Sequence, residues 1–237
     1  MLRHRFSEQF QVAATQEFRK LQQKGTFEYI DDDTVDHLEE TPLPLLWVFK
    51  YKFDSDGYLT KFKARLCARG DLQPTMQDTY AATLAAQTFR AMMAITAAFD
   101  LETRQYDAIN AFVNAKLPTP RIIECPEGFK QSRKVLLLQK ALYGLKEAPL
   151  LWHREFTAKL EELGLFPVPG VNCLYTNNWL TIIFYVDDFI AFYSSRHTYQ
   201  MDRFEAQLLQ NYEIRALGET NHFLGVRILR DRPNRKL

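Results

Sequence analysis

Residues 179–193 read Trp-Leu-Thr-Ile-Ile-Phe-Tyr-Val-Asp-Asp-Phe-Ile-Ala-Phe-Tyr, an apolar stretch that two adjacent aspartates divide. Its β-branched and aromatic residues favour strands, so the pattern predicts a strand, a break and a second strand. Like charges about 4 Å apart repel by roughly 4 kcal/mol at an effective dielectric constant of about 20, so Asp187 and Asp188 require either a solvated turn or a cation. Two interpretations are therefore open: a polar β-turn between core strands, and a divalent-metal site at a hairpin tip.

The composition is that of an ordinary globular protein, with 46% hydrophobic and 25% charged residues among 237. The net charge is +1, so any surface for a polyanion would have to be local. Cys67, Cys125 and Cys173 are widely spaced, which predicts a reducing compartment and no disulfide framework. The sequence shows neither a secretory signal nor an apolar run long enough for a bilayer, so we expect an intracellular protein without a membrane partner.

A β-hairpin is predicted where residues 47–53 and 58–65 flank Asp54-Ser-Asp-Gly57, because Asp-Gly is a strong turn signal. Side chains alternate between the two faces of a strand, so lysines and arginine gather on one face of each predicted strand. One interpretation is an exposed lysine-rich face, which protects a sheet against edge pairing. The other is a flap that binds phosphate, to which Arg69 would add a further hydrogen-bond donor. Register permitting, five cations would line this face: Lys50, Lys52, Lys61, Lys63 and Arg65.

The remaining pattern predicts an α+β fold, a mixed or antiparallel sheet backed by helices. We expect a helix over 7–24 that Ser7 caps, and one over 83–99 with a buried stripe of Phe89, Met92, Met93, Ile95 and Phe99. Further helices are predicted from Pro149 to a Gly164 cap and over 197–210. Predicted strands cover 103–107, 121–126, 135–139, 173–176, 212–215 and 222–229.

Several polar positions have a structural and a functional interpretation. Asp107 closes a predicted strand, where it is either an ordinary strand-end or helix-cap residue or an acidic ligand at a sheet edge. Tyr143-Gly144 precedes a helix, and a glycine there could let the backbone approach a ligand closely. The acidic run 31–33 is interpreted as a solvated loop.

Seven stretches in order resemble the reverse transcriptase of copia-type LTR retrotransposons, the pseudovirus class, in forms similar to those of fungal genomes. The resemblance covers about residues 8–229. The matching stretches are Gln16-Glu-Phe…Gly25-Thr-Phe-Glu28, Lys50-Tyr-Lys-Phe-Asp with Lys63-Ala-Arg-Leu…Ala68-Arg-Gly, Gln105-Tyr-Asp-Ala-Ile-Asn-Ala-Phe-Val-Asn114, Pro126-Glu-Gly-Phe129, Leu142-Tyr-Gly-Leu-Lys…Pro149…Trp152, Tyr185-Val-Asp-Asp188 and Phe223-Leu-Gly225.

The resemblance implies a polymerase palm and fingers, as one domain over 8–230 with fingers to about residue 100 and palm from about 101. It also implies an RNA-directed DNA polymerase, a nucleotidyltransferase that uses two Mg²⁺ or Mn²⁺ ions. Asp107 and Asp187 would be the principal ligands and Asp188 the third catalytic carboxylate, with the main-chain carbonyl of Ala108 as a further ligand. One ion would activate the primer 3′-hydroxyl, and the other would bind the incoming triphosphate.

The resemblance assigns nucleotide contacts to a second set of residues. Phe112 would lie under the sugar and exclude a 2′-hydroxyl, with a plain core phenylalanine as the alternative. Lys63, Arg65 and Arg69 fall in the fingers hairpin that contacts the triphosphate. Tyr143 and Gly144 fall in the loop near the nascent base pair.

The implied partners are an RNA template, a DNA or tRNA primer, a deoxynucleoside triphosphate and other polyprotein domains such as integrase and ribonuclease H. The implied locations are a cytoplasmic particle and the nucleus. The sequence departs from the family at Asn114-Ala115, where a turn glycine is usual, and over 80–87. Integrase, protease and ribonuclease H segments are not seen. Two other functions therefore stay open: a nucleic-acid-binding remnant without catalysis, and a metal-dependent nuclease or phosphotransferase.

Overall fold

A computed structural model describes residues 4–34, 41–54, 56–74 and 79–237, and the chain forms two compact units. The first unit comprises Met1–Thr79 and Phe112–Leu151, and the second comprises Tyr80–Ala111 and Trp152–Leu237. The chain therefore passes between the units three times, whereas the sequence predicts a single change, from fingers to palm, near residue 100. The predicted domain over 8–230 would include both units, and it stays a prediction.

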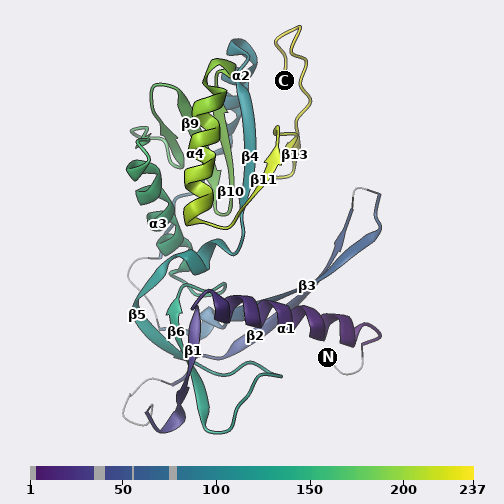
Figure 1. Ribbon diagram of the computed structural model, residues 1–237, viewed down its shortest axis with the longest axis vertical. Coiled ribbons are helices and arrows are strands. Elements are labelled where there is room, and N and C mark those ends of the chain that lie inside the picture. The colour runs from purple at the N-terminus through teal and green to yellow at the C-terminus, as the bar shows by residue number, and fades with distance from the viewer. Residues whose placement is uncertain (1–3, 35–40, 55, 75–78) are drawn as a thin grey trace. The chain divides into compact units, whose positions relative to one another are not determined.

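The first unit combines one long helix with two small antiparallel sheets (Figure 1). Helix α1 buries Phe10, Ala14, Phe18 and Leu21, a spacing of three to four residues that puts them on one face. One sheet has the order β1-β6-β5, and β2 and β3 form a separate hairpin. The elements are α1 (Ser7–Gln23), β1 (Phe27–Asp31), η1 (Asp32–Thr34), β2 (Leu45–Phe53), β3 (Leu59–Ala68), η2 (Gly70–Leu72), β5 (Lys116–Ile123) and β6 (Lys134–Lys140).

The β2–β3 hairpin has the turn that its sequence predicts. The Asp54 carboxylate accepts hydrogen bonds from the backbone N–H of Asp56 at 3.1 Å and of Tyr58 at 2.8 Å. One face of the hairpin packs on α1, because the rings of Phe49, Tyr51 and Phe62 lie 5.1 to 5.3 Å from that of Phe10. The opposite face is left for polar side chains.

The second unit is built on a six-stranded antiparallel sheet with the order β11-β4-β10-β9-β8-β7. Figure 1 shows α4 crossing the face of β4, β9 and β10. A two-stranded hairpin, β12–β13, accompanies this sheet. The elements are α2 (Ala86–Phe99), β4 (Glu102–Ala108), β7 (Phe166–Pro167), β8 (Leu174–Thr176), β9 (Leu180–Tyr185), β10 (Asp188–Tyr193), η4 (Ser195–His197), α4 (Thr198–Asn211), β11 (Ile214–Gly218), β12 (His222–Phe223) and β13 (Val226–Arg227), and η3 (Ala111–Asn114) and α3 (Ala148–Glu162) each include residues of both units.

Aromatic side chains fill the core between this sheet and its helices. Tyr106 on β4 stacks on Phe189 of β10 with ring centroids 4.8 Å apart, and the Tyr106 hydroxyl donates to Glu205 of α4 at 2.8 Å. Phe156 of α3 contacts Phe189 and also Phe184 of β9. One face of the central strands is thus covered by α3 and α4. Because side chains alternate along a strand, the strand residues on either side of Tyr106, Phe184 and Phe189 point to the other face.

The α+β prediction is confirmed, and most predicted elements are present. Gly164 ends α3 in the left-handed region, at φ +82°, as a helix cap requires. Ser7 is the first residue of α1 instead of its cap, because Phe6 occupies the cap position without a side-chain hydrogen bond. The predicted strand over 222–229 is wrong: Leu224 and Gly225, at φ +49° and +79°, form a turn between β12 and β13.

The predicted buried stripe of α2 is only partly right. Phe89 and Met92 are buried, and Thr96 completes the stripe at helical spacing. Ile95 and Phe99 are 42% and 71% exposed: Ile95 lies about a quarter turn from the centre of that stripe, and Phe99 is the last residue of the helix.

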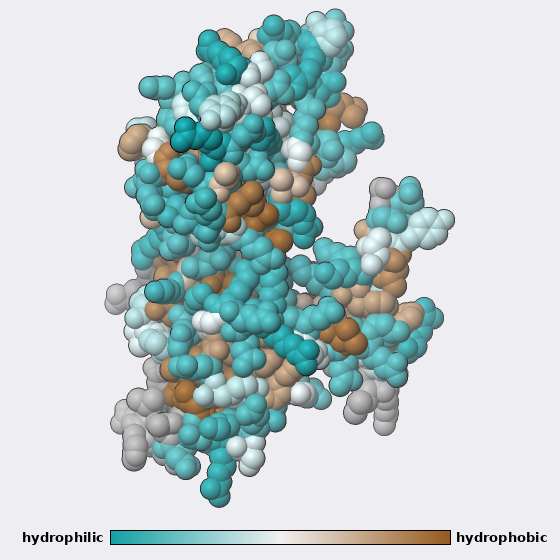
Figure 2. Space-filling view, in the orientation of Figure 1, coloured by the Kyte–Doolittle hydropathy of each residue, from teal (hydrophilic) through white to brown (hydrophobic). Residues whose placement is uncertain are grey.

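The surface in Figure 2 is mostly hydrophilic, with apolar side chains scattered over it. Within the ranges that the structure describes, no helix is both long and apolar enough to cross a bilayer. The three cysteines are thiols, with Cys125 and Cys173 buried.

Candidate active site

Two of the three predicted carboxylates are direct neighbours across the central sheet. Asp188, the first residue of β10, pairs with Asp107 on β4 and with Tyr185 on β9. Residues paired in an antiparallel ladder point to the same face, with Cβ atoms roughly 4.5–5.5 Å apart. Because Tyr106 and Phe189 occupy the helix-covered face, Asp107 and Asp188 project from the other one.

The third carboxylate, Asp187, lies in the tight turn between β9 and β10. Only Val186 and Asp187 connect the two strands. Val186 has φ +57°, a left-handed conformation that costs a β-branched residue about 1–3 kcal/mol. A two-residue hairpin loop requires a positive φ at its first position, where glycine or asparagine is usual. The turn is therefore strained, and other contacts must hold it.

Both carbonyls of this turn are hydrogen bonded within the second unit. The Trp152 indole Nε1–H donates to the Val186 carbonyl at 2.7 Å. The Ala108 backbone N–H donates to the Asp187 carbonyl at 2.7 Å. Since Ala108 follows Asp107 in β4, this second bond also ties the two aspartates to each other.

The carboxylates are close enough to affect one another electrostatically. Burial, together with the charges of Asp187 and Asp107, raises the pKa of Asp188 to about 6. A neighbouring like charge disfavours ionisation, as in other carboxylate clusters. Arg215, opposite Asp107 on β11, has a guanidinium nitrogen 3.8 Å from the Asp107 carboxylate. This edge of the sheet thus gathers negative charge, with the Arg215 guanidinium beside Asp107.

Hard oxygen donors of this kind suit Mg²⁺ or Mn²⁺. Burial and the neighbouring carboxylates both raise the pKa of Asp188, and a bound cation would relieve the repulsion between the carboxylates, so the donor set fits such an ion in chemistry. In geometry the fit is incomplete: among the residues that the structure describes, no group of three His, Cys, Asp or Glu side chains is gathered as a metal requires. The side chains would have to converge on the ion.

The register of the β2–β3 hairpin places the five predicted cations on one face. Lys50 pairs directly with Lys63, and Lys52 pairs with Lys61. Arg65 is opposite Val48 on the same face. Like charges directly across a ladder are destabilising by roughly 0.2–1 kcal/mol per pair. The hairpin therefore keeps two like-charged pairs on this face, and the Glu17 carboxylate of α1 lies close enough to interact with Lys63 and Arg65.

A pocket of about 340 Å³ opens on this basic face, entirely within the first unit. The Arg65 guanidinium lies 3.9 Å above the Tyr143 ring, a cation–π contact that fixes its direction. The Tyr143 ring lies 4.5 Å from that of Phe112, which is 7% exposed. The pocket is lined by Val48, Lys50, Lys52, Lys63, Arg65, Cys67, Tyr143 and Gly144.

Gly144 allows the backbone to approach a neighbour closely, but that neighbour is Ala68 at the end of β3 and not a ligand. A Cβ on Gly144, at φ +93°, would lie 2.1 Å from the Ala68 carbonyl oxygen. The Ala68 N–H also donates to the Tyr143 carbonyl at 2.7 Å. Buried Glu147, 5% exposed, fixes the far side of this loop by accepting hydrogen bonds from Gln73 at 2.9 Å and Arg121 at 3.0 Å.

The predicted residues thus fall into two groups. Asp107, Ala108, Asp187 and Asp188 are together in the second unit. Lys63, Arg65, Phe112, Tyr143 and Gly144 are together in the first. Arg69, also in the first unit, is half-buried and forms a two-pronged ion pair with Asp71 at 2.8 and 2.9 Å, outside the pocket lining.

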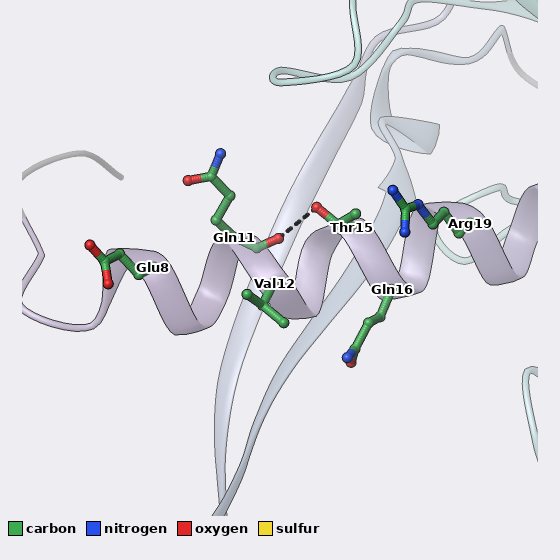
Figure 3. A pocket seen from close by; sticks show the side chains of 6 residues that line it. All are labelled: Glu8, Gln11, Val12, Thr15, Gln16 and Arg19. Atoms are coloured by element: carbon green, nitrogen blue, oxygen red, sulfur yellow. Dashed lines mark hydrogen bonds between the residues drawn. The ribbon is translucent and has the colours of Figure 1, made fainter.

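Another hollow in the first unit, of about 390 Å³, lies along α1 (Figure 3). All of its lining side chains come from this one helix, and the Thr15 hydroxyl donates to the Gln11 carbonyl at 2.9 Å. It is a surface depression whose polar groups do not converge. The lining residues are Glu8, Gln11, Val12, Thr15, Gln16 and Arg19.

Sequence reasoning missed three features of these sites. The first is the hydrogen bond from the Trp152 indole to the Val186 carbonyl, of which helical spacing gives no sign. The second is the Gln73–Glu147 contact, whose partners are 74 positions apart. The third is the positive φ of Val186. The sequence did carry a signal for it, because a β-branched residue in a two-residue hairpin loop is unusual.

Comparison with known proteins agrees with the motifs. A sequence profile described as "Reverse transcriptase (RNA-dependent DNA polymerase)" matches residues 33–237. The "Retrovirus-related Pol polyprotein from transposon TNT 1-94" of Nicotiana tabacum is 29% identical over 248 aligned positions, covering 100% of this chain and 18% of that protein. The "Transposon Ty1-DR4 Gag-Pol polyprotein" of Saccharomyces cerevisiae is 28% identical over 218 positions, covering 89% of this chain and 13% of that protein.

A solved structure titled "Crystal structure of Prototype Foamy Virus Protease-Reverse Transcriptase (native)" overlaps with a TM-score of 0.43 and 16% identity, covering 82% of this chain and 22% of that one. The chain spans under a fifth of the length of the two transposon polyproteins. The profile and the two polyproteins confirm the resemblance that the sequence motifs predict. The profile covers most of the chain, which therefore belongs to the reverse transcriptase (RNA-dependent DNA polymerase) family.

Proposed function

We propose that this chain is the RNA-directed DNA polymerase core of a retrotransposon polyprotein and adds deoxynucleotides to a primer 3′-hydroxyl with two divalent ions. The observation that carries the proposal is the direct pairing of Asp188 with Asp107 beside the turn that contains Asp187. Carboxylates gathered in this way raise the cost of ionising one another, and bound divalent cations would relieve that repulsion.

The catalytic end would be held by residues of the second unit. Asp107 and Asp187 would bind the ions, Asp188 would be the third carboxylate, and the Ala108 carbonyl would be a further ligand. Bound divalent ions would supply activation of the 3′-hydroxyl and stabilisation of the leaving pyrophosphate. The protein's own part is to hold Asp187 in its strained turn and to keep Asp107 in register with Asp188.

The nucleotide end would be held by residues of the first unit. Lys63 and Arg65 would bind the triphosphate, because their face carries directly opposed lysines whose repulsion an anion relieves. The Tyr143 ring orients the Arg65 guanidinium for a two-pronged contact with phosphate oxygens. Phe112, packed on Tyr143, would restrict the sugar to a deoxyribose. Arg69 is a weaker candidate for this role, since Asp71 already pairs with it.

The proposed partners follow from the same chemistry. They are an RNA template, a DNA or tRNA primer, a deoxynucleoside triphosphate and other domains of a polyprotein, because the relatives are named Pol and Gag-Pol polyproteins. The proposed places of action are a cytoplasmic particle and the nucleus.

Primer extension on an RNA template, with Mg²⁺ or Mn²⁺, tests this function. We expect a primer to be lengthened only when deoxynucleotides and a divalent ion are both present. Asp187→Asn should reduce the rate by a factor of about 100 or more, the usual loss when a group that stabilises developing charge is removed. The matched control is Asp33→Asn, because Asp33 is an exposed carboxylate of the first unit.

The control variant should extend primers at the rate of the unaltered chain. Extension that Asp187→Asn leaves unchanged would contradict the proposal. Salt-dependent binding to a primer–template duplex without extension would favour a non-catalytic remnant. Degradation of the duplex without any need for nucleotides would favour a nuclease.

A further inference from the structure

The peptide groups on either side of Asp187 are both fixed by hydrogen bonds. The carbonyl before Asp187 belongs to Val186 and accepts from the Trp152 indole at 2.7 Å. The carbonyl of Asp187 itself accepts from the Ala108 N–H, also at 2.7 Å. When both flanking peptide planes are held, the Asp187 backbone dihedrals are held too, and with them the direction of its Cα–Cβ bond.

The Trp152 indole is a rigid donor. Its side chain is 2% exposed, and its ring stacks on Phe156 at 5.3 Å and meets Tyr212 edge-on at 5.4 Å. The Tyr212 hydroxyl in turn donates to Glu155 at 3.2 Å, which ties this end of the second unit back to α3. An indole packed in this way donates in one direction only, and that direction is the Val186 carbonyl.

The hydrogen bond from the Trp152 indole matters because the residue that accepts it, Val186, has a strained backbone. A β-branched residue at φ +57° is strained and tends to return to negative φ, which would turn the Val186–Asp187 peptide group away. The strain is sustained only where surrounding contacts over-determine the conformation. The indole bond to the Val186 carbonyl is such a contact.

We propose that Trp152 is a positioning residue for the Asp187 carboxylate, acting through its hydrogen bond to the strained Val186 carbonyl. The inference deepens the proposed function and rests on it for its catalytic meaning. Its structural content, a turn held by the indole, stands on the described contacts alone. Trp152 touches no reacting atom in this scheme and acts only through the turn.

The test replaces Trp152 with phenylalanine, which keeps a ring for Phe156 and Tyr212 and removes the N–H donor. The first measurement is hydrogen exchange of the Ala108 amide by NMR, because that amide bonds to the Asp187 carbonyl and needs neither metal nor substrate. We expect exchange to quicken by about fivefold, the factor for loss of one hydrogen bond of average net strength. Trp179→Phe is the matched control, since Trp179 lies in the same unit with its ring near His197 and Phe204.

The second measurement is the affinity of the full chain for Mn²⁺, followed by electron paramagnetic resonance. Trp152→Phe should weaken Mn²⁺ binding and lower kcat, with KM for the deoxynucleotide unchanged. Adding Val186→Gly to Trp152→Phe should restore Ala108 protection and Mn²⁺ affinity, because glycine adopts positive φ without strain. A purely structural role for the ring would not be corrected by a change in the turn.

Ala108 exchange that stays within about twofold of the unaltered chain in folded Trp152→Phe would overturn the inference. An effect that Val186→Gly fails to correct would assign the indole to packing and overturn it as well. If Trp152→Phe does not fold, the single variant Val186→Gly tests the inference instead. In that variant the Ala108 amide should stay protected and the Mn²⁺ affinity should be unchanged. Loss of either would refute the inference. If the unaltered chain adds no nucleotide to a primer, the proposed function is wrong. Exchange of the Ala108 amide still tests whether the Trp152 indole holds the turn.

Discussion

Replacing Asp188 with asparagine should stabilise the metal-free protein at neutral pH. Burial and the charges of Asp187 and Asp107 raise the pKa of the Asp188 carboxyl from 3.8 to about 6. Because the folded-state pKa is the higher one, the contribution of Asp188 to stability is complete below pH 4 and is lost as the pH rises through 6. Asparagine has nearly the same shape and carries no charge, so it avoids that loss.

The magnitude follows from the shift. A shift of about 2 pKa units corresponds to roughly 3 kcal/mol, and the half-exposed position of Asp188 reduces this to about 1–2 kcal/mol through solvent screening. For a chain of this length, such a gain raises Tm by about 3–6 °C. Urea unfolding of Asp188→Asn and of the unaltered chain, with a chelator present, from pH 3.5 to 7.5, measures it.

The pH dependence separates this cause from others. The gain in unfolding free energy should be present at pH 7.5 and should vanish at pH 3.5, where the aspartate is protonated. Asp33→Asn, a change to an exposed carboxylate, should show no such dependence. A gain of equal size at both pH values, or a loss of stability at pH 7.5, would refute the electrostatic reasoning. Mg²⁺ should stabilise the unaltered chain more than Asp188→Asn at pH 7.5.

Three further predictions concern the first unit. Gly144→Ala should lower the unfolding free energy by more than Gly128→Ala, because both positions have positive φ but only a Cβ on Gly144 would meet a carbonyl oxygen, at 2.1 Å. The positive φ alone costs about 1–3 kcal/mol, and thermal unfolding compares the two variants. Arg121→Met should destabilise by about 2–4 kcal/mol by weakening the pairing of buried Glu147, and equal stability of the variant in urea would contradict this. Phe112→Ala should raise the use of ribonucleotides relative to deoxynucleotides in primer extension, whereas an unchanged ratio would leave Phe112 as a core residue.

Local patterns in the sequence predict much of this fold. The Asp54–Gly57 turn and the alternation around it predict the hairpin, and the register then brings Lys50 opposite Lys63. That part succeeds because a two-residue periodicity and a turn signal are properties of neighbouring residues. The α2 stripe fails at Ile95, about a quarter turn from the buried residues, and at Phe99, the last residue of the helix, because only the packing decides how far the buried face extends.

For the carboxylate site, too, part could be predicted from neighbouring residues and part could not. The sequence by itself determined that Asp187 and Asp188 break an apolar strand pair, and its motifs determined the family. Only the tertiary structure decided that Asp107, about 80 residues earlier, pairs with Asp188, and that the Trp152 indole donates a hydrogen bond to the turn that contains Asp187. The physical reason is that strand pairing across a sheet and a hydrogen bond from a distant helix depend on how the whole chain packs. Neither leaves a periodic trace in the residues around the site.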